Sequence, residues 1–270
     1  MRVKINGIRR GLGPIGARLL STISSRNPEM VFTVPEVRQL MKIRGSRLRK
    51  MLHDLAQNQW IERIENGKYL LLPLEAGPHP IYGTDPFIIA RKLVDPYYIG
   101  FASALNYYGI TEQAPNTIYV VTTKQKRKLV FHSTEYRFIR FEKSHFFGFI
   151  EEWIGNLKFR ISDKEKTIID CLYMPEYSLG LTEVTKAFRN EVDFEKLSEY
   201  AVRMKDANVI KRLGFMIDVL ELNSDLADKL AKKVTGGFAL LDRGGKKSGP
   251  KNKKWRVIEN IEKADLEVEL

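Results

Sequence analysis

Residues 33–74, TVPEVRQLMKIRGSRLRKMLHDLAQNQWIERIENGKYLLLPL, hold the signals of two short helices followed by a tight β-hairpin. The segment opens with Thr33-Val-Pro-Glu36. This is the spacing of a capping box, in which the threonine hydroxyl and the glutamate carboxylate accept hydrogen bonds from backbone N–H groups at a helix start. We predict a first helix that ends near Lys42 and turns its apolar positions to one side, at Val37, Leu40 and Met41.

A second helix is predicted after a glycine-containing turn, with Ser46 as its N-cap and its end at about Gln59. Four apolar residues of this stretch fall on one side, and the basic residues lie off that stripe. In a helix-turn-helix, cations on the second helix meet phosphates while polar side chains reach base edges. A solvated basic face is the alternative. The predicted DNA contacts here are Arg44, Ser46, Arg47, Arg49, Lys50 and His53.

After Trp60 the apolar period changes from 3.6 to 2, and two strand-like runs flank Glu65-Asn-Gly67. Asn-Gly between such runs predicts a hairpin, because a type I′ turn needs positive φ at both central residues. A hairpin in this position would lie along the sugar-phosphate backbone and add affinity more than sequence choice. We expect Arg63 and Lys68 to contact DNA there. An earlier helix is predicted from the apolar stripe Ile15, Leu19, Leu20 and Ile23, and we expect Arg10, at its entry, to meet a flanking phosphate.

The basic charge of the chain is concentrated in this module. The chain carries a net charge of +12, and residues 1–74 hold 14 basic against 5 acidic side chains. Charge gathered on a segment with helix-turn-helix spacing is the pattern expected of a phosphate binder. We therefore predict that residues 1–74 form a winged helix-turn-helix domain that binds double-stranded DNA.

A proline- and glycine-rich stretch separates this module from the rest of the chain. Residues 75–86 are read as a linker, because this composition sustains neither helix nor strand. Closely spaced strand signals follow between 118 and 161, and helical patterns dominate from 164 to 234, including one at 181–190. The predicted fold class is α+β, with residues 87–270 forming a larger domain that has a mainly antiparallel sheet and a helical segment.

Two further basic stretches of the larger domain form a possible secondary nucleic-acid surface. One is a charged turn after the first strand signal, and the other is a glycine-containing loop from Arg243 to Lys254 that holds six basic residues and no acidic one. The candidate residues are Lys124, Lys126, Arg127, Lys128, Lys246, Lys247, Lys251, Lys253 and Lys254.

The sequence carries no recognisable catalytic or metal-binding motif, so no enzyme activity, metal or cofactor is expected. The four histidines are scattered, the single cysteine, Cys171, is read as a core residue, and a G-x-G-x-x-G match at 11–16 has no strand before it. Asp163, Glu165 and Asp170 lie close together on a helix that begins with the capping-box spacing Ser162-Asp-Lys-Glu165. We read Asp170 as solvated; a nucleotide-processing enzyme is the alternative that these acids suggest.

No stretch approaches the twenty apolar residues that a membrane-spanning helix needs. The first thirty residues lack the apolar segment of a signal peptide. Together with the single cysteine, which excludes an internal disulfide, these features favour a cytoplasmic protein without a membrane partner.

Four blocks, in order along the chain, resemble the AbiEi-type antitoxins, the transcription regulators of abortive-infection (type IV) toxin-antitoxin systems. YYIGFASALNYYGITEQ at 97–113 resembles the family segment YYIS..SAL..HGLTEQ, and ISDKEKTIIDCL at 161–172 resembles S..EKTLLD.L. KRLG at 211–214 is a third block, and the last runs from Leu241-Asp242 through Asn252 and Trp255 to Asn260.

The resemblance implies an autorepressor that binds inverted repeats in its own promoter through the N-terminal domain. It also implies that the larger domain counteracts a nucleotidyltransferase-like toxin, without a stable complex between the two proteins. An interaction module that sequesters a toxin by direct contact is a further alternative.

Overall fold

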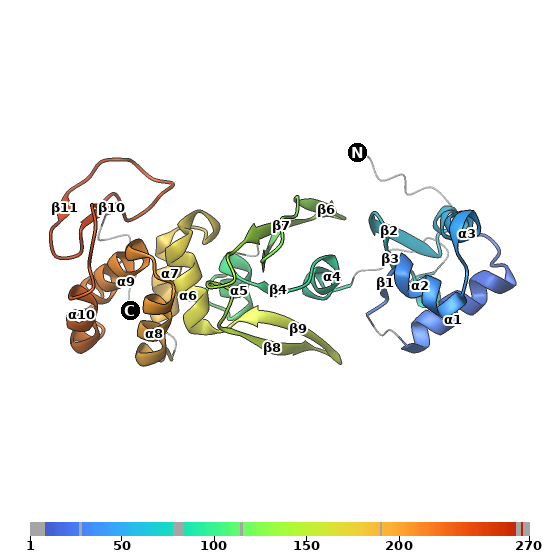
Figure 1. Ribbon diagram of the computed structural model, residues 1–270, viewed down its shortest axis with the longest axis horizontal. Helices are drawn as coiled ribbons and strands as arrows, with labels where there is room; N and C mark the ends of the chain where they lie inside the picture. The colour runs from blue at the N-terminus through green and yellow to red at the C-terminus, as the bar shows by residue number, and fades with distance from the viewer. Residues whose placement is uncertain are drawn as a thin grey trace. The chain divides into compact units, whose positions relative to one another are not determined.

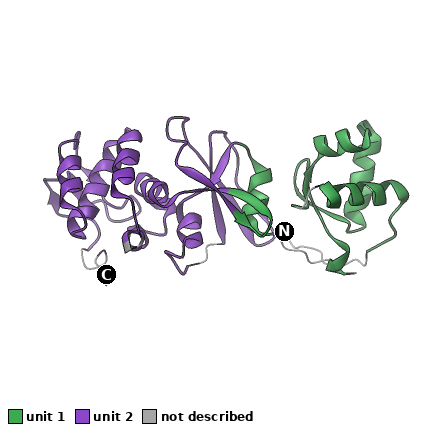
Figure 2. Ribbon diagram, turned by 90° about the horizontal axis from the view of Figure 1, so that it is seen from below, with its two compact units in different colours: residues 1–95, 153–159 green, residues 96–152, 160–270 purple. Residues whose placement is uncertain are grey.

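The protein has a mixed α+β fold with three β-sheets in the part of the chain that the structure describes (Figure 1). This computed structural model describes residues 9–26, 29–77, 84–113, 116–189, 191–262 and 266. Contacts divide the chain into two compact units, residues 1–95 with 153–159, and residues 96–152 with 160–270 (Figure 2). Each unit is described by itself below.

The described residues from 9 to 71 of the N-terminal unit form three α-helices and a three-stranded sheet. Leu19 and Ile23 of the first helix pack with Leu52 of the third in a buried core that also includes Phe32 and Trp60. In chain order the elements are α1 (Pro14–Arg26), β1 (Val31–Thr33), α2 (Val34–Met41), α3 (Gly45–Gln57), β2 (Ile61–Glu65) and β3 (Lys68–Leu71).

The predicted capping box is present at the start of α2. The Glu36 N–H donates to Thr33 Oγ1 at 3.4 Å, and the Thr33 N–H donates to Glu36 Oε2 at 2.6 Å. The start of α3 differs from the prediction, since Arg44 is the N-cap residue and Ser46 lies inside the helix. Gly45 has a φ of +64°. A residue without a side chain adopts this conformation easily, so the chain turns into the helix before Ser46.

The sheet of this unit has the order β1-β3-β2, and both strand pairs are antiparallel. β2 and β3 form the predicted hairpin, but its turn is not the expected type I′, because Gly67 has a φ of +78° whereas Asn66 does not have a positive φ. The Val34 N–H donates to the Gly67 carbonyl at 2.9 Å. The turn is therefore joined to the start of α2.

The first compact unit extends to Asp95, beyond residue 86, where the predicted linker ends. The difference is α4 (Pro86–Leu93), which forms ion pairs with the turn before β1 and with α2: Arg91 lies 2.8 Å from Glu29, and Lys92 lies 3.3 Å from Glu36. The short 3₁₀ helix η1 (Leu74–Ala76) begins the predicted linker. Its central residues, 78–83, lie outside the described residues.

The larger unit is built on a mixed sheet with the strand order β6-β7-β5-β4-β9-β8. The predicted antiparallel pairing holds in part: β4 pairs antiparallel with β5 and β6 with β7, but β5 pairs in parallel with β7 and β4 pairs in parallel with β9. β6 pairs antiparallel with the edge of β7 that faces away from β5. The β6-β7 hairpin reverses the chain direction, so β7 runs in the same direction as β5. The strands are β4 (Tyr97–Ile99), β5 (Thr117–Thr122), β6 (Leu129–Phe131), β7 (Thr134–Arg140), β8 (Phe149–Ile154) and β9 (Leu157–Ser162).

Helices and a second small sheet complete this unit. The α-helix predicted at 181–190 ends earlier in the structure. It corresponds to α7 (Leu181–Lys186), which is followed by 3₁₀ helix η3 (Ala187–Arg189); residue 190 lies outside the described residues. Another 3₁₀ helix, η2 (Pro175–Tyr177), follows α6. The α-helices are α5 (Phe101–Tyr107), α6 (Lys164–Tyr173), α7 (Leu181–Lys186), α8 (Phe194–Arg203), α9 (Ala207–Val219) and α10 (Ser224–Ala231).

Helix α6 turns charged side chains into the core. Its N-cap is Asp163 rather than the predicted Ser162, and the Asp163 carboxylate accepts from the Lys166 N–H at 2.8 Å. The expectation that Asp170 is solvated is wrong: Asp170 and Lys166 are both fully buried and form an ion pair. The Tyr98 hydroxyl donates to Asp170 at 2.8 Å. Three aromatic rings, of Tyr98, Phe141 and Phe147, surround the Lys166 ammonium.

The small sheet has the order β10-β12-β11, formed by Ala239–Leu240, Val257–Ile258 and Lys251–Asn252. It is held to α9 by Trp255, which is fully buried and donates from Nε1 to Asp218 at 2.8 Å. The Trp255 ring lies against Gly214, where a Cβ atom would approach it to 1.9 Å. Only glycine therefore fits at position 214 with the tryptophan in place.

Candidate nucleic-acid interface

A groove of about 730 Å³ separates α3 from the β2-β3 hairpin in the N-terminal unit. Arg49 and His53 enter it from α3, and Arg63 and Asn66 border it from the hairpin. No acidic residue from the described part of the chain lines this groove. The remaining lining residues are Val34, Arg38, Gly45, Leu48, Leu52, Ala56, Gly67 and Tyr69.

The groove presents basic side chains that form no ion pair within the protein. Arg49 and His53 are exposed, and within the described part of the chain neither forms an ion pair with a carboxylate. Arg63 is also exposed and donates to Asn66 Oδ1 at 3.1 Å and to the Glu65 carbonyl at 3.4 Å. An anion entering this groove would meet positive charge and free donors with no competing carboxylate.

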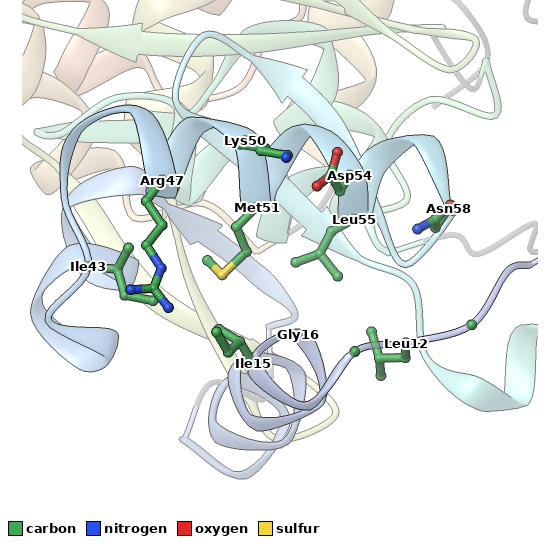
Figure 3. A pocket seen from close by; sticks show the side chains of 12 residues that line it. Leu12, Ile15, Gly16, Ile43, Arg47, Lys50, Met51, Asp54, Leu55 and Asn58 are labelled. Atoms are coloured by element: carbon green, nitrogen blue, oxygen red, sulfur yellow. The ribbon is translucent and has the colours of Figure 1, made fainter.

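Other basic residues of α3 lie on its opposite flank. Arg47 and Lys50 line a second hollow, of about 350 Å³, between α3 and the start of α1 (Figure 3). Its walls are apolar at Ile15, Ile43 and Met51. Asp54 borders the same hollow and provides one opposing charge. The candidate residues of α3 are thus divided between two flanks of one helix.

Arg44, Ser46 and Arg10 lie outside both hollows, and all three are exposed. Arg9, which the sequence analysis did not single out, fixes the chain before α1. Its guanidinium donates to the Leu72 and Pro73 carbonyls, each at 2.7 Å, and lies 4.5 Å from the Trp60 ring centroid. Burial lowers the pKa of Arg9, and Glu75 opposes this shift. Arg10 next to it remains at the surface.

Lys68 differs from the other predicted contacts because its ammonium is already bound. It lies 2.9 Å from Glu65 Oε1 and donates to the Leu93 carbonyl at 2.6 Å. Arg38, Asn66 and Tyr69 also line the groove, but they were not predicted as DNA contacts from the sequence. Arg38 could have been found from its place on α2 off the apolar positions, whereas Asn66 and Tyr69 enter only through the fold of the hairpin.

The two secondary basic stretches differ in how far they are neutralised. After β5, Lys128 lies 2.9 Å from Glu135, and Lys126 lies 5.1 Å from the Phe138 ring centroid. Lys124 and Arg127 belong to the same turn. In the loop before β12, Lys254 lies 2.8 Å from Asp218. Lys246, Lys247, Lys251 and Lys253 are exposed and form no ion pair within the described residues.

The acidic residues around α6 are each bound by cations. Lys196 lies 3.2 Å from Asp163 and 2.8 Å from Glu165, and these carboxylates raise its pKa despite the opposing effect of burial. Burial and then the charge of Asp163 raise the pKa of Tyr200 to about 12. Among the described residues, no group of three or more His, Cys, Asp and Glu side chains could hold a metal ion.

In the described part of the chain, no helix has the length and apolar character needed to cross a membrane. Cys171 is buried, and burial raises the pKa of its thiol well above the usual value.

Comparison with known proteins adds information on the fold. No protein-family model matches the chain, and no curated protein matches it. Among solved structures, the RV2827C protein from Mycobacterium tuberculosis is similar in fold, with a TM-score of 0.64 and 12% sequence identity. The similarity covers 93% of this chain and 93% of that one. It extends over both compact units.

Proposed function

We propose that the N-terminal unit is a winged helix-turn-helix domain that binds double-stranded DNA. The observation that carries this proposal is the groove between α3 and the β2-β3 hairpin, which gathers basic side chains without ion-pair partners and, among the described residues, contains no acid. The order helix, strand, helix, helix, strand, strand supports it, as does the sheet order β1-β3-β2. This arrangement places a second helix and a hairpin side by side, as a helix-turn-helix with a wing requires.

In this proposal α3 enters the major groove with its exposed face. Arg49 and His53 reach base edges or adjacent phosphates from the hairpin side, and Arg63 follows the backbone. Arg47 and Lys50, on the flank toward α1, take phosphates on the other side of the helix, together with Arg10. Lys68 is left out of the interface because Glu65 and the Leu93 carbonyl already hold its ammonium.

Salt dependence tests this proposal directly. If the protein neutralises about six phosphates, its affinity for duplex DNA falls by roughly a thousandfold between about 50 and 200 mM salt. We would titrate the full chain against the DNA upstream of its own gene, with a random duplex of the same length as the comparison. An affinity for duplex DNA that does not change with salt would contradict a phosphate-binding interface.

We further propose that the protein represses its own operon and acts as the antitoxin to a nucleotidyltransferase-like toxin. The four sequence blocks that resemble AbiEi-type antitoxins support this, and three of them map to α5, α6 and α9. A reporter driven by the upstream DNA should be repressed by the protein, and co-expression should restore growth of cells that carry the toxin. Restoration of growth only when the two proteins co-purify would favour direct sequestration. Transfer of labelled nucleotide by the purified protein would favour an enzyme instead.

A further inference from the structure

A second concentration of positive charge lies in the larger unit. Residues 232–256 hold nine basic side chains and one acidic one, Asp242. Apart from these residues and residues 1–74, the chain has 22 basic against 27 acidic side chains, a net charge of −5. The basic character of the protein therefore belongs to two separate segments. The second of them includes the small sheet and the long loop between β10 and β11, which arcs outward in Figure 1.

The small sheet exposes an aromatic ring between cations. Arg256 is exposed in the turn before β12, its carbonyl accepts from the Ala239 N–H at 2.9 Å, and its guanidinium donates to the Gly236 carbonyl at 2.7 Å. The parallel register pairs Ala239 with Val257, which places Phe238 next to Arg256. Phe238 is 43% exposed, and the Lys251 ammonium lies 5.3 Å from its ring centroid.

Few carboxylates neutralise this surface. Arg243 lies 3.8 Å from Glu176, and Lys254 pairs with Asp218. For the other cations of residues 232–256, no ion pair occurs within the described part of the chain; these are Lys232, Lys233, Lys246, Lys247, Lys251, Lys253 and Arg256.

A buried cation beneath this face adds to the excess of positive charge. Lys211 is 2% exposed and donates to the Gly237 carbonyl at 2.6 Å. Burial lowers its pKa, and the nearby charge of Arg256 lowers it further. A bound anion at this face would relieve the repulsion between these two cations.

We propose that the face formed by Phe238, Lys251 and Arg256, with the adjoining loop, binds single-stranded nucleic acid. One base stacks on the Phe238 ring while the cations contact the phosphates on either side. The Lys251 side chain, which covers the ring in the free protein, is long enough to move to a phosphate when a base takes its place. Asn260 donates to the Lys246 carbonyl at 2.6 Å and so holds this part of the loop, with the exposed side chains of Lys246 and Lys247 directed to solvent as further phosphate contacts.

The aromatic ring favours a single strand over a duplex. In a duplex the bases are stacked on one another and cannot offer a face to a side chain, whereas unpaired bases stack readily on exposed aromatic rings. This surface lies in a different unit from the duplex interface proposed above. The inference therefore stands independently of that proposal.

The test is fluorescence anisotropy of the full chain with three labelled probes: a 12-nucleotide oligo(U), a 12-nucleotide oligo(dT) and a 12-base-pair duplex. Phe238→Ala should weaken single-strand binding about tenfold, within the range of roughly 5- to 150-fold that base stacking gives. Phe238→Trp should retain the affinity. Phe238→Leu, which keeps apolar bulk without a ring face, should lose it as alanine does. Arg256→Gln should lower the salt slope of single-strand binding by roughly 0.7.

Matched controls separate this surface from general effects. Trp153 is 55% exposed with Lys158 4.8 Å from its ring centroid, so Trp153→Ala removes a similar aromatic pair outside the basic segment. It should leave single-strand binding unchanged, and Arg49→Gln should weaken only duplex binding. Binding of either single-stranded probe supports the assignment, and the stronger identifies the partner as RNA or DNA. Unchanged single-strand affinity in a folded Phe238→Ala variant, or an equal loss for the duplex, would overturn it.

Discussion

Helices α3 and α6 carry similar residue types but use their charges in opposite ways. Arg49 and His53 of α3 stand in solvent beside a groove that no acid among the described residues lines. Lys166 and Asp170 of α6 are fully buried and bind each other. An exposed cation without a partner costs the protein little and remains available to a ligand, whereas a buried charge must be paired within the fold. The comparison therefore separates charges that face a binding partner from charges that belong to the core.

The largest effect is expected from breaking the buried pair. Asp170→Asn leaves the Lys166 ammonium without a carboxylate in the core and should lower the free energy of unfolding by about 3–5 kcal/mol. The double variant Lys166→Met with Asp170→Asn should recover most of this loss, because no uncompensated charge remains and the asparagine oxygen can still accept from Tyr98. Urea unfolding of the three proteins measures both values.

Asp225→Asn is the matched control for this experiment, since Asp225 lies exposed in the first turn of α10. It should change the free energy of unfolding by less than about 1 kcal/mol. If Asp170→Asn were as mild as this control, the contrast between the two helices would be wrong.

An intermediate effect, on binding rather than stability, is expected in α3. Arg49→Gln should weaken binding to duplex DNA by about 1–3 kcal/mol if the side chain reads a base, while the free energy of unfolding stays within about 0.5 kcal/mol of the wild-type value. Arg26→Gln, in the last turn of α1 and outside both hollows, is the control. A loss of stability in Arg49→Gln, or equal DNA binding by both variants, would remove α3 from the interface.

The smallest effect is expected from Glu36, a half-exposed carboxylate of the N-terminal unit. Burial pushes its pKa up, but the hydrogen bonds from Thr33 and the ion pair with Lys92 outweigh this and leave the pKa below the usual value. Since the folded-state pKa is lowered, this carboxylate stabilises the fold above its unfolded pKa of about 4.3, and the stabilisation is lost as the pH falls through the folded value.

Thermal unfolding between pH 7 and pH 3 measures this contribution. Glu36→Gln should cost less than about 1 kcal/mol at pH 7, and the difference from wild type should vanish at the acid end. A difference that grows as the pH falls would show that the sign of the pKa shift is wrong.

Local signals in the sequence predicted local structure well. The capping box at Thr33 and the Asn-Gly hairpin depend on residues within a few positions of each other, and both are present. The spacing of Lys166 and Asp170 fits an exposed pair on a helix equally well. Their burial depends on Tyr98, more than sixty residues earlier in the chain.

Other features could not be predicted from the sequence, because they also depend on contacts between residues far apart in the chain. The parallel pairing of β5 with β7 requires knowledge of where the β6-β7 hairpin folds back. The binding of Lys68 to the Leu93 carbonyl depends on α4 contacting α2 and the turn before β1. The periodicity of α3 identified its exposed side, but the division of its cations between two flanks is set by the hairpin and by α1.

The contact between Trp255 and Gly214 determines how much the basic loop can vary. The indole is fixed at the C-terminal side of the loop by Asp218 and by the helix backbone, and β10 fixes the other side through its pairing with β12. The loop can therefore change in length while its two ends stay in place. Lys247 and Ser248 lie between the Lys246 carbonyl, which Asn260 holds, and the tightly packed Gly249, and should accept inserted residues such as an epitope or a tag, whereas a single methyl group at position 214 or 249 should not be accommodated.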